Sequence, residues 1–285
     1  MTRRVGLLGK PLKRRHSQVM HDAAFDAAGI DARYVLLELE PDEVEGAVRD
    51  ARGPDWLGLG VTAPYKRVVA ELVDEVEPDA VAIGAVNNVA RSRSGLLVGF
   101  NTDAPGFRAG AELTMGRSLS GATVVVVGAG GAAHAVVYAC LDAGARWVTI
   151  ANRTDSTARA VADRFLGVGN GSVVAIPSSG LVFEAALAGA DLAVNATTVG
   201  MLDPGMTIPV DRLPETATVF DLVYVPAETP LVAAARARGL RAANGSEMLI
   251  AQAAIAFERW TGVGGMADVM RTAVAPLLAD PTVRA

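Results

Sequence analysis

Several kinds of residue are scarce in this 285-residue sequence. Cys140 is the single cysteine, which excludes an internal disulfide and a metal site built from cysteines. The three histidines, His16, His21 and His134, have spacings that suit no metal site, so we expect no bound metal. Positive charge is in deficit, with a formal net charge of −5, and this balance gives no electrostatic case for binding nucleic acid.

A long apolar helix is also missing from the pattern. The most hydrophobic stretch, residues 124–141, contains a glycine-rich turn and so lacks the continuous run of about 20 residues that spans a membrane. Arg3 and Arg4 precede only a few apolar residues, unlike a signal peptide. We therefore expect a soluble, cytoplasmic protein whose partners are small molecules rather than membranes or nucleic acid. The sequence does not distinguish a monomer from a homodimer.

What the sequence does contain is an α/β composition with 30 glycines, organised around residues 123–133. Five β-branched residues, 123–127, are typical of a strand buried on both faces of a parallel sheet. Gly128, Gly130 and Ala133 then fit the pattern G-x-G-x-x-G/A, in which the backbone approaches a pyrophosphate at the start of a helix. A second strand at 147–151 completes the unit, which predicts a dinucleotide-binding site.

The residues after that second strand indicate which dinucleotide binds. An NAD site usually has an acidic residue there that holds the ribose 2′-hydroxyl. This sequence has Asn152-Arg153-Thr154 instead, and an arginine can pair with a 2′-phosphate. We therefore expect NADP rather than NAD. We interpret the next residue, Asp155, as the N-terminal cap of a helix over 156–165 rather than as a ribose ligand.

Strands and helices alternate before the dinucleotide motif. The expected strands span 4–9, 34–39 and 56–62, and the expected helices span 18–28, 42 onwards and 64–76. Asp42 and Glu45 would form a capping-box pair, and His21 would lie at a helix start. Ser94-Gly95 would turn a hairpin between strands at 86–91 and 96–100. The pattern predicts an α/β substrate domain with a mainly parallel sheet.

A doubly wound Rossmann domain for NADP is expected next. Its strands are predicted at 123–127, 147–151, 173–176, 191–195, 218–223 and 239–242. A helix over 105–113 leads into this domain, and two helices after Asn244 return to the first one. The predicted boundaries are therefore 1–103, completed by 244–285, for the substrate domain and 104–243 for the Rossmann domain.

Two charged residues, Lys66 and Asp103, follow strands where α/β sheets bind ligands. Hydride transfer to a carbonyl needs a proton donor beside the carbonyl oxygen, and a lysine next to an aspartate can supply one. Each residue also has an ordinary explanation. A lysine at a helix start is commonly solvated surface, and Asp103 can cap the helix that begins near Pro105.

A series of short words runs in order along nearly the whole chain. They are Gly9-x-Pro11, Ser17 with His21, Val61-Thr62-x-Pro64-x-Lys66, Gly84-Ala85-Val86-Asn87, Asn101-Thr102-Asp103, Gly128-Ala129-Gly130-Gly131-Ala132, Asn152-Arg153-Thr154, Asn195-Ala196-Thr197-Thr198-Val199-Gly200-Met201 and Gln252-Ala253. With these words the sequence resembles the shikimate dehydrogenase family of shikimate and quinate dehydrogenases. The resemblance implies a two-domain NADP enzyme that interconverts 3-dehydroshikimate and shikimate.

The resemblance also implies roles for individual residues. Lys66 and Asp103 match the family's catalytic pair. Substrate binding is implied at the ring hydroxyls for Thr62, Asn87 and Gln252, and near the carboxylate for Tyr224. The cofactor residues expected from the glycine motif and the resemblance are Gly128, Ala129, Gly130, Gly131, Ala132, Asn152, Arg153, Thr154, Thr197, Val223 and Gly245.

The sequence departs from the family at one end of the substrate site. Where the family has a serine pair that binds the ring carboxylate, this sequence has Arg15 and Ser17. The proline that follows the pair is Gln18, and the asparagine before the V-T-x-P word is Gly60. Arg15 can bind a carboxylate or can lie on a solvated basic loop. The open alternatives are a paralogue acting on quinate, an amino-shikimate or another cyclic polyol acid, and a nucleotide-binding protein without turnover.

Overall fold

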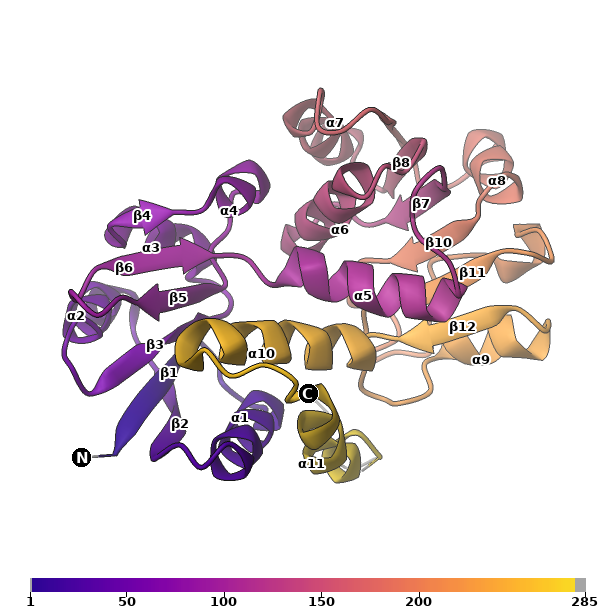
Figure 1. Cartoon of the computed structure of the whole chain (residues 1–285). Coiled ribbons are helices and arrows are strands. Elements are labelled where there is room, and N and C mark those ends of the chain that lie inside the picture. The colour runs from indigo at the N-terminus through magenta and orange to yellow at the C-terminus, as the bar shows by residue number, and fades with distance from the viewer. Residues whose placement is uncertain (1, 280–285) are drawn as a thin grey trace. The chain divides into compact units, whose positions relative to one another are not determined.

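The computed structural model describes residues 2–279 and divides into two compact units. One unit contains the chain up to Thr102 together with Ile250–Leu277, and the other contains Asp103–Leu249. Each unit has its own six-stranded sheet with helices packed on it (Figure 1). The second change of unit falls inside the helix α10 (Ser246–Thr261), and the first falls directly before Asp103, so Asp103 belongs to the second unit.

The first unit has a mixed sheet in the order β2-β1-β3-β5-β6-β4. Its elements are β1 (Arg3–Gly9), α1 (His16–Ala27), β2 (Ala32–Glu38), η1 (Pro41–Glu43), α2 (Val44–Asp50), β3 (Trp56–Val61), α3 (Lys66–Leu72), β4 (Glu75–Val76), α4 (Pro78–Ile83), β5 (Asn88–Arg91), β6 (Leu97–Phe100) and, near the end of the chain, α11 (Ala267–Ala279). The strands β2, β1 and β3 are parallel, as are β4 and β6, whereas β5 runs antiparallel to both β3 and β6. The mainly parallel sheet and the hairpin are therefore confirmed.

Different helices cover the two faces of this sheet. Leu59 and Val61 of β3 belong to a buried apolar cluster that also contains residues of α2 and α3. On the other face, Trp260 of α10 donates a hydrogen bond from its indole Nε1 to the backbone oxygen of Val89 at 3.0 Å. Gly58 permits this approach, because a Cβ atom built there would lie 2.6 Å from Trp260 Nε1.

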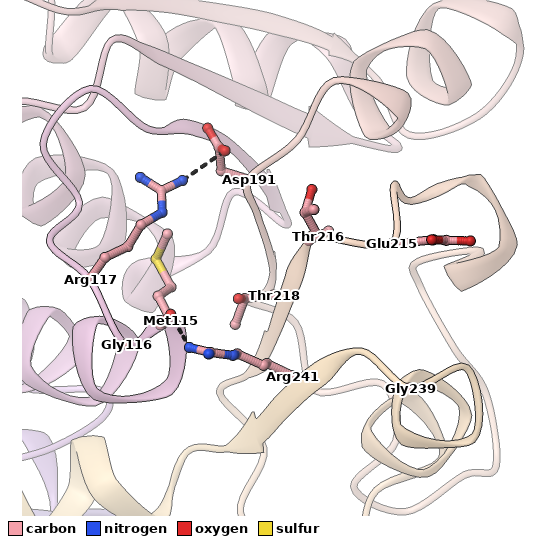
Figure 2. A pocket seen from close by; sticks show the side chains of 10 residues that line it. Met115, Gly116, Arg117, Asp191, Glu215, Thr216, Thr218, Gly239 and Arg241 are labelled. Carbon is pink, nitrogen blue, oxygen red and sulfur yellow. Dashed lines mark hydrogen bonds and ion pairs between the residues drawn. The ribbon is translucent and has the colours of Figure 1, made fainter.

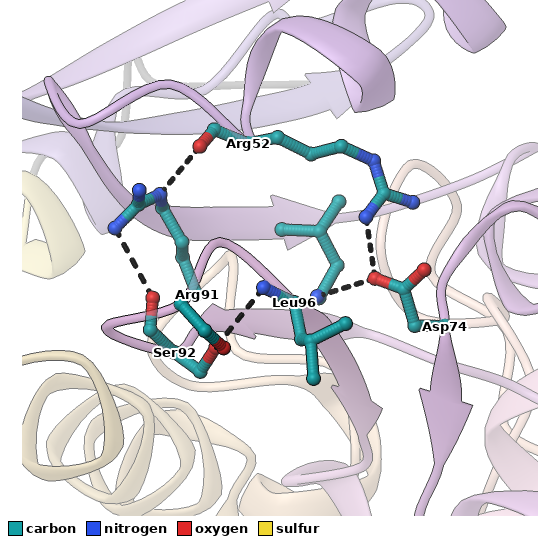
Figure 3. A network of polar contacts seen from close by, with 7 residues as sticks. Arg52, Asp74, Arg91, Ser92 and Leu96 are labelled. Carbon is teal, nitrogen blue, oxygen red and sulfur yellow. Dashed lines mark hydrogen bonds and ion pairs between the residues drawn. The ribbon is translucent and has the colours of Figure 1, made fainter.

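The helix predicted over 64–76 is present, but it is shorter than predicted and spans only Lys66–Leu72. The helix α3 ends at Leu72, and Asp74 then accepts hydrogen bonds from Arg52 and from the backbone N–H of Leu97, the latter at 2.7 Å (Figure 3). These bonds tie the chain to the hairpin, where Glu75 and Val76 pair with β6 as a short strand. The segment is thus extended because a neighbouring strand supplies its hydrogen bonds, which helix periodicity does not register.

The predicted capping box at Asp42 and Glu45 is also wrong. The reciprocal pair is Glu40 and Glu43, and Pro41 occupies the first helical position of η1. Proline fixes φ near the helical value and lacks the N–H that would go unpaired there, so it sets the start of the helix. The cap therefore lies at residue 40.

The second unit has an all-parallel sheet in the order β12-β11-β10-β7-β8-β9. Its elements are α5 (Asp103–Met115), β7 (Thr123–Val127), α6 (Gly131–Asp142), β8 (Trp147–Asn152), α7 (Asp155–Arg164), β9 (Ser172–Pro177), α8 (Leu181–Ala188), β10 (Leu192–Asn195), η2 (Val210–Arg212), β11 (Thr218–Asp221), α9 (Pro230–Ala237) and β12 (Arg241–Asn244). This strand order confirms the doubly wound Rossmann fold. The valines of β7, 124–127, are buried on both faces, as predicted.

Two strand predictions in this unit are shifted. The strand expected over 218–223 ends at Asp221, because the backbone N–H of Val223 bonds to the carboxylate of Asp221 and turns the chain. The strand expected over 239–242 spans Arg241–Asn244 instead. Gly239 has a φ of 76° and ends the preceding helix, so the last strand cannot begin until the chain has passed it. Across residues 2–279, no helix is both long and apolar enough to span a bilayer.

Candidate functional site

The turn between β7 and α6 presents open backbone at the carboxyl edge of the second sheet. Gly128 has a φ of 112°, and a Cβ atom there would lie 2.9 Å from the backbone oxygen of Ala196. Gly130 occupies the N-cap position of α6 without a side-chain cap, and Gly130, Gly131 and Ala132 are exposed. Ala129 is buried at the turn. The N–H groups and positive dipole end of α6 therefore face outward, where a phosphate can accept from them.

This turn lies at the switch point of the sheet. The strands β7 and β10 are neighbours, but the chain leaves β7 toward β8 on one side and returns to β10 on the other. Ligands of doubly wound sheets bind in the crevice outside the carboxyl ends of the strands at such a point. Gly128 from β7 and Thr197 from β10 meet there, with Thr197 Cγ2 2.9 Å from the position of a Cβ atom on Gly128.

The segment after β8 carries an exposed cation. Arg153 and Thr154 are exposed, and Asn152 donates from Nδ2 to the backbone oxygen of Thr154 at 3.0 Å. The expectation that Asp155 caps the helix is wrong: Thr154 holds the N-cap position, and Asp155 is the first residue of α7. Its carboxylate pairs with Arg159 one turn later at 2.7 Å, so this acidic group is engaged within its own helix.

A buried polar network holds the loops that follow β10 and β11. The side-chain oxygen of Asn195 accepts from the Thr197 hydroxyl at 2.7 Å, and its Nδ2 donates to the Asp221 carboxylate at 2.8 Å. That carboxylate also accepts from the Val223 N–H at 3.1 Å and from the Thr229 hydroxyl at 2.7 Å. Burial raises the pKa of Asp221 above its usual value, while these donors act in the opposite direction. The network thus fixes two predicted cofactor residues, Thr197 and Val223.

Gly245, another predicted cofactor residue, follows β12, and steric crowding requires a glycine there. A Cβ atom there would lie 2.3 Å from the backbone oxygen of Leu222, and the Gly245 N–H donates to Val223 at 3.3 Å. The loops after β11 and β12 can therefore approach closely. Tyr224, next to Val223, is half-buried. No role was predicted from the sequence for Asn195, Asp221 or Thr229, although polar residues at the ends of apolar strands were the available signal.

A cavity of about 470 Å³ lies at the opposite, amino edge of the same sheet (Figure 2). Arg117 pairs there with Asp191 at 2.7 Å, and Arg241 donates to the backbone oxygen of Met115. Thr218, the first residue of β11, also lines it. These charged groups are matched within the cavity, and ligands of parallel sheets bind at the other end of the strands. We therefore assign the cofactor edge to the carboxyl ends and not to this cavity.

The first unit has a buried polar cluster at the end of its hairpin. Asn87 donates to the Thr102 hydroxyl at 3.1 Å and accepts from the Thr102 N–H at 2.8 Å. Asn88 donates to both of these side chains at 2.9 Å. Thr102 is only 1% exposed, so the chain is fixed immediately before Asp103. The Asn87 amide is thereby oriented by two residues of the same unit.

Three of the other predicted residues of the first unit, Ser17, Thr62 and Lys66, follow the carboxyl ends of the parallel strands β1 and β3. Thr62 follows β3 and donates from its backbone to Leu8, and Lys66 opens α3 and accepts on its backbone oxygen from Val86 at 3.0 Å. Ser17 lies in the first turn of α1, and Gln252 lies in α10. Thr62, Lys66, Ser17 and Gln252 are all half-buried, a state compatible with binding a small molecule. Asp103 opens α5 in the second unit.

Arg15 directly precedes α1 and is exposed. Its Nε donates to Oε1 of Gln18 at 2.9 Å, and Gln18 in turn donates to the backbone oxygen of Tyr34 at 3.0 Å. The interpretation of His21 as a helix-start residue is wrong. His21 lies in the interior of α1, is 3% exposed and stacks on Tyr34 with ring centroids 4.6 Å apart. Burial lowers the pKa of His21 to about 3, so it is neutral.

No group of three or more histidine, cysteine, aspartate or glutamate side chains within residues 2–279 is arranged to hold a metal ion.

Comparisons with known proteins agree with this geometry. Residues 7–89 match the family model described as the shikimate dehydrogenase substrate binding domain, 110–200 match shikimate / quinate 5-dehydrogenase, and 245–275 match the shikimate 5′-dehydrogenase C-terminal domain. Shikimate dehydrogenase (NADP(+)) of Rubrobacter xylanophilus is 44% identical over 95% of this chain and 94% of its own length.

Solved structures share the whole fold. Shikimate 5-dehydrogenase of Thermus thermophilus in complex with NADP(H) and shikimate is 35% identical, with a TM-score of 0.85 over 96% of this chain and 99% of that one. The 5-ketofructose reductase of a Gluconobacter strain is 31% identical, with a TM-score of 0.89 over 97% of this chain and 99% of that one.

Proposed function

We propose, since the chain belongs to the shikimate dehydrogenase family, that it is an NADP-dependent oxidoreductase that interconverts 3-dehydroshikimate and shikimate. The observation that carries this proposal is the 44% identity to a shikimate dehydrogenase (NADP(+)) over nearly the full length of both chains. The activity belongs to the oxidoreductases that act on CH–OH groups. The alternative, a nucleotide-binding protein without turnover, would need no proton donor. The half-buried Lys66 at the start of α3 therefore supports an enzyme.

NADP is the cofactor of this activity, and the second unit offers groups that fit each part of it. The outward amides of Gly130 and Gly131 at the start of α6 suit the pyrophosphate. Exposed Arg153 suits the 2′-phosphate, which it can bind through two parallel N–H groups. The acidic neighbour Asp155 is paired with Arg159, so it does not substitute for the carboxylate that an NAD site uses. Thr197, Val223 and Gly245 would lie beside the nicotinamide half.

The substrate is assigned to the first unit. Thr62, Asn87 and Gln252 carry hydroxyl and amide groups that suit the ring hydroxyls of shikimate, and Asn87 is already held in one orientation by Thr102. Ser17 would bind at the carboxylate end, with Arg15 supplying a positive charge nearby. Tyr224 of the second unit would complete the carboxylate end. This assignment makes the first unit the substrate domain and the second unit the cofactor domain.

Lys66 and Asp103 are the proposed proton-transfer pair. When bound, NADPH supplies the hydride that adds to the carbonyl carbon of 3-dehydroshikimate. The Lys66 ammonium gives a proton to the carbonyl oxygen, so that the alcohol forms without a charged alkoxide. Asp103 is the proposed partner whose carboxylate orients the lysine for this transfer. In the oxidising direction the same pair removes the proton from the hydroxyl.

A substrate panel tests the proposal. Shikimate, quinate and an amino-shikimate should each be measured with NADP and with NAD, following the reduced nicotinamide by its absorbance. We expect the highest kcat/KM for shikimate with NADP. A higher value for quinate or the amino compound would assign the enzyme to a paralogous substrate. Binding of NADPH without turnover of any of the three would make the chain a nucleotide-binding protein.

A further inference from the structure

Gly60 is one of the positions where the sequence departs from the family, and a tyrosine side chain fills the space beside it. A Cβ atom built on Gly60 would lie 2.6 Å from the hydroxyl oxygen of Tyr34 and 3.3 Å from Leu7 Cδ1. No real Cβ atom approaches an oxygen so closely, so any side chain at position 60 requires the tyrosine to move. The Tyr34 hydroxyl therefore stands where a residue-60 side chain would begin.

Tyr34 is held firmly in this position. Its backbone N–H donates to the carboxylate of Asp22 at 2.8 Å, and its backbone oxygen accepts from Gln18 at 3.0 Å. The ring stacks on His21 with an interplanar angle of 15° and is 3% exposed. Because these contacts fix both the backbone and the ring of Tyr34, they also fix the direction in which its hydroxyl points.

The hydroxyl lies on the face of the sheet toward which a side chain at position 60 would point. Gly60 and Thr62 lie two residues apart along one chain direction and so share a face, whereas Leu59 and Val61 pack into the cluster on the opposite face. On α1, Ser17 precedes His21 by one helical turn and lies on the same side of that helix. Thr62 thus follows Gly60 by two residues just after β3, and Ser17 precedes by one helical turn the His21 ring that stacks on Tyr34.

We propose that the Tyr34 hydroxyl, in the space left by Gly60, donates a hydrogen bond to the carboxylate end of the substrate and is a specificity-determining residue. This inference rests on the proposed function, because it assumes an acidic substrate seated between Ser17 and Thr62. It assigns a role to a residue that the glycine motif and the family words do not mark. It also explains why position 60 is glycine in this chain.

The chemistry of the phenol fits a donor. Burial raises the pKa of Tyr34 well above its usual value of 10, so the hydroxyl is protonated at neutral pH. A protonated phenol donates one hydrogen bond, and a carboxylate oxygen is the acceptor that gains most from it. His21 is neutral, so it does not compete as a cation for the same carboxylate.

The first test is Tyr34→Phe, which removes the hydroxyl and retains the ring. We expect the KM for shikimate to rise by about 10- to 100-fold, the loss of one hydrogen bond to a charged group. The kcat, the KM for NADP and the melting temperature should stay close to the wild-type values. The matched control is Tyr138→Phe in α6 of the second unit, for which the KM for shikimate should not change. An unchanged KM in Tyr34→Phe would overturn the proposal.

The second test removes the hydroxyl at position 34 and places an amide at position 60. Gly60→Asn alone should collide with the Tyr34 hydroxyl and lower both stability and activity. The Tyr34→Phe background removes the hydroxyl that causes the collision and leaves Leu7 Cδ1 at 3.3 Å and the ring carbon Cζ at 3.7 Å from the Cβ position. The double variant should therefore recover much of the shikimate KM lost in Tyr34→Phe. A merely structural tyrosine would show no such recovery, and that result would overturn the proposal.

The proposed function and the proposed role of Tyr34 are contradicted by different results. If wild-type protein does not turn over shikimate, the proposed function fails and the Tyr34 assignment fails with it. If wild-type protein turns over shikimate and the Tyr34→Phe variant has the same KM, only the assignment of Tyr34 is overturned.

Discussion

The carboxylate of Asp221 anchors both loops that follow β10 and β11, so its removal should disturb stability and cofactor binding together. In Asp221→Ala, three donors lose their acceptor: Asn195 Nδ2, the Val223 N–H and the Thr229 hydroxyl. Asn195 still donates to the backbone oxygen of Val199, and Thr229 still accepts from the Val232 N–H. The Asn195 amide therefore stays hydrogen-bonded, through Val199 and through the Thr197 and Thr207 hydroxyls, whereas the Thr229 hydroxyl keeps a bond only as an acceptor.

The magnitude follows from this count of lost bonds. A buried donor without a partner costs about 1–3 kcal/mol, and both the Val223 N–H and the Thr229 hydroxyl lose the carboxylate to which they donate. We expect Asp221→Ala to lower the free energy of unfolding by about 3–5 kcal/mol. At about 2–4 °C for each kcal/mol in a protein of this size, the melting temperature should fall by about 6–20 °C. The KM for NADP should rise more than the KM for shikimate, because Thr197 and Val223 lose their anchor.

The isosteric variant Asp221→Asn separates charge from shape. Its amide oxygen can still accept from Asn195 and Val223, so the loss of stability should be about 1 kcal/mol. Burial raises the folded-state pKa of Asp221 above 3.8, and the stability linked to this proton is complete below pH 3.8 and is lost as the pH rises through the folded-state pKa. The variant has no titrating group there. Its stability relative to wild type should therefore improve as the pH rises from about 4.

Thermal unfolding between pH 4 and pH 8, with NADPH titrations followed by fluorescence, measures these effects. The matched control is Asp211→Ala, because the Asp211 carboxylate is 71% exposed and its loss should change the melting temperature by less than about 2 °C. If Asp221→Ala unfolds within 1 kcal/mol of wild type, the carboxylate does not anchor the loops. An unchanged pH dependence in Asp221→Asn would show that the charge is not linked to folding.

Three further outcomes are expected. Arg153→Ala should raise the KM for NADP by about 10- to 100-fold and leave the KM for NAD nearly unchanged, and equal use of both cofactors by wild type would contradict this. Lys66→Ala should lower kcat by about 10²- to 10⁴-fold while NADPH still binds by fluorescence titration, and adding Asp103→Ala should cost little more, whereas additive losses would separate the pair. Arg15→Ala should lower kcat/KM for shikimate by at least about 10-fold if its charge serves the carboxylate, and unchanged kinetics would assign it to Gln18 and solvent.

The strands of the second unit were predicted well because the residues within each strand, and not distant partners, determine its conformation. The valines of β7 are buried, and Gly128, which follows them, adopts the positive φ that glycine permits at a turn. The strand at 147–151 and the helix between the two strands were predicted for the same reason. Errors occur where a distant partner decides the conformation. Asp74 is extended because of Arg52 and Leu97, which no pattern within residues 64–76 can reveal.

The sequence alone predicts the cofactor-binding residues better than it predicts the residues that bind the acidic end of the substrate. A phosphate is bound largely by backbone N–H groups, and glycine spacing encodes backbone geometry directly. The acidic end of a substrate is bound by side chains whose neighbours come from separate strands. Tyr34 and Gly60 lie on β2 and β3, which do not pair with each other but each pair with β1.

Their coupling follows from the packing across β1. A substitution at position 60 looks like the loss of a polar group when the sequence is read along β3 alone. With the Tyr34 hydroxyl 2.6 Å from the vacant Cβ position, the same substitution is a transfer of a polar group from one strand to another. Because the hydroxyl can reach only what lies beside Gly60, the identity of residue 60 and the position of Tyr34 have to be considered as one determinant of substrate choice.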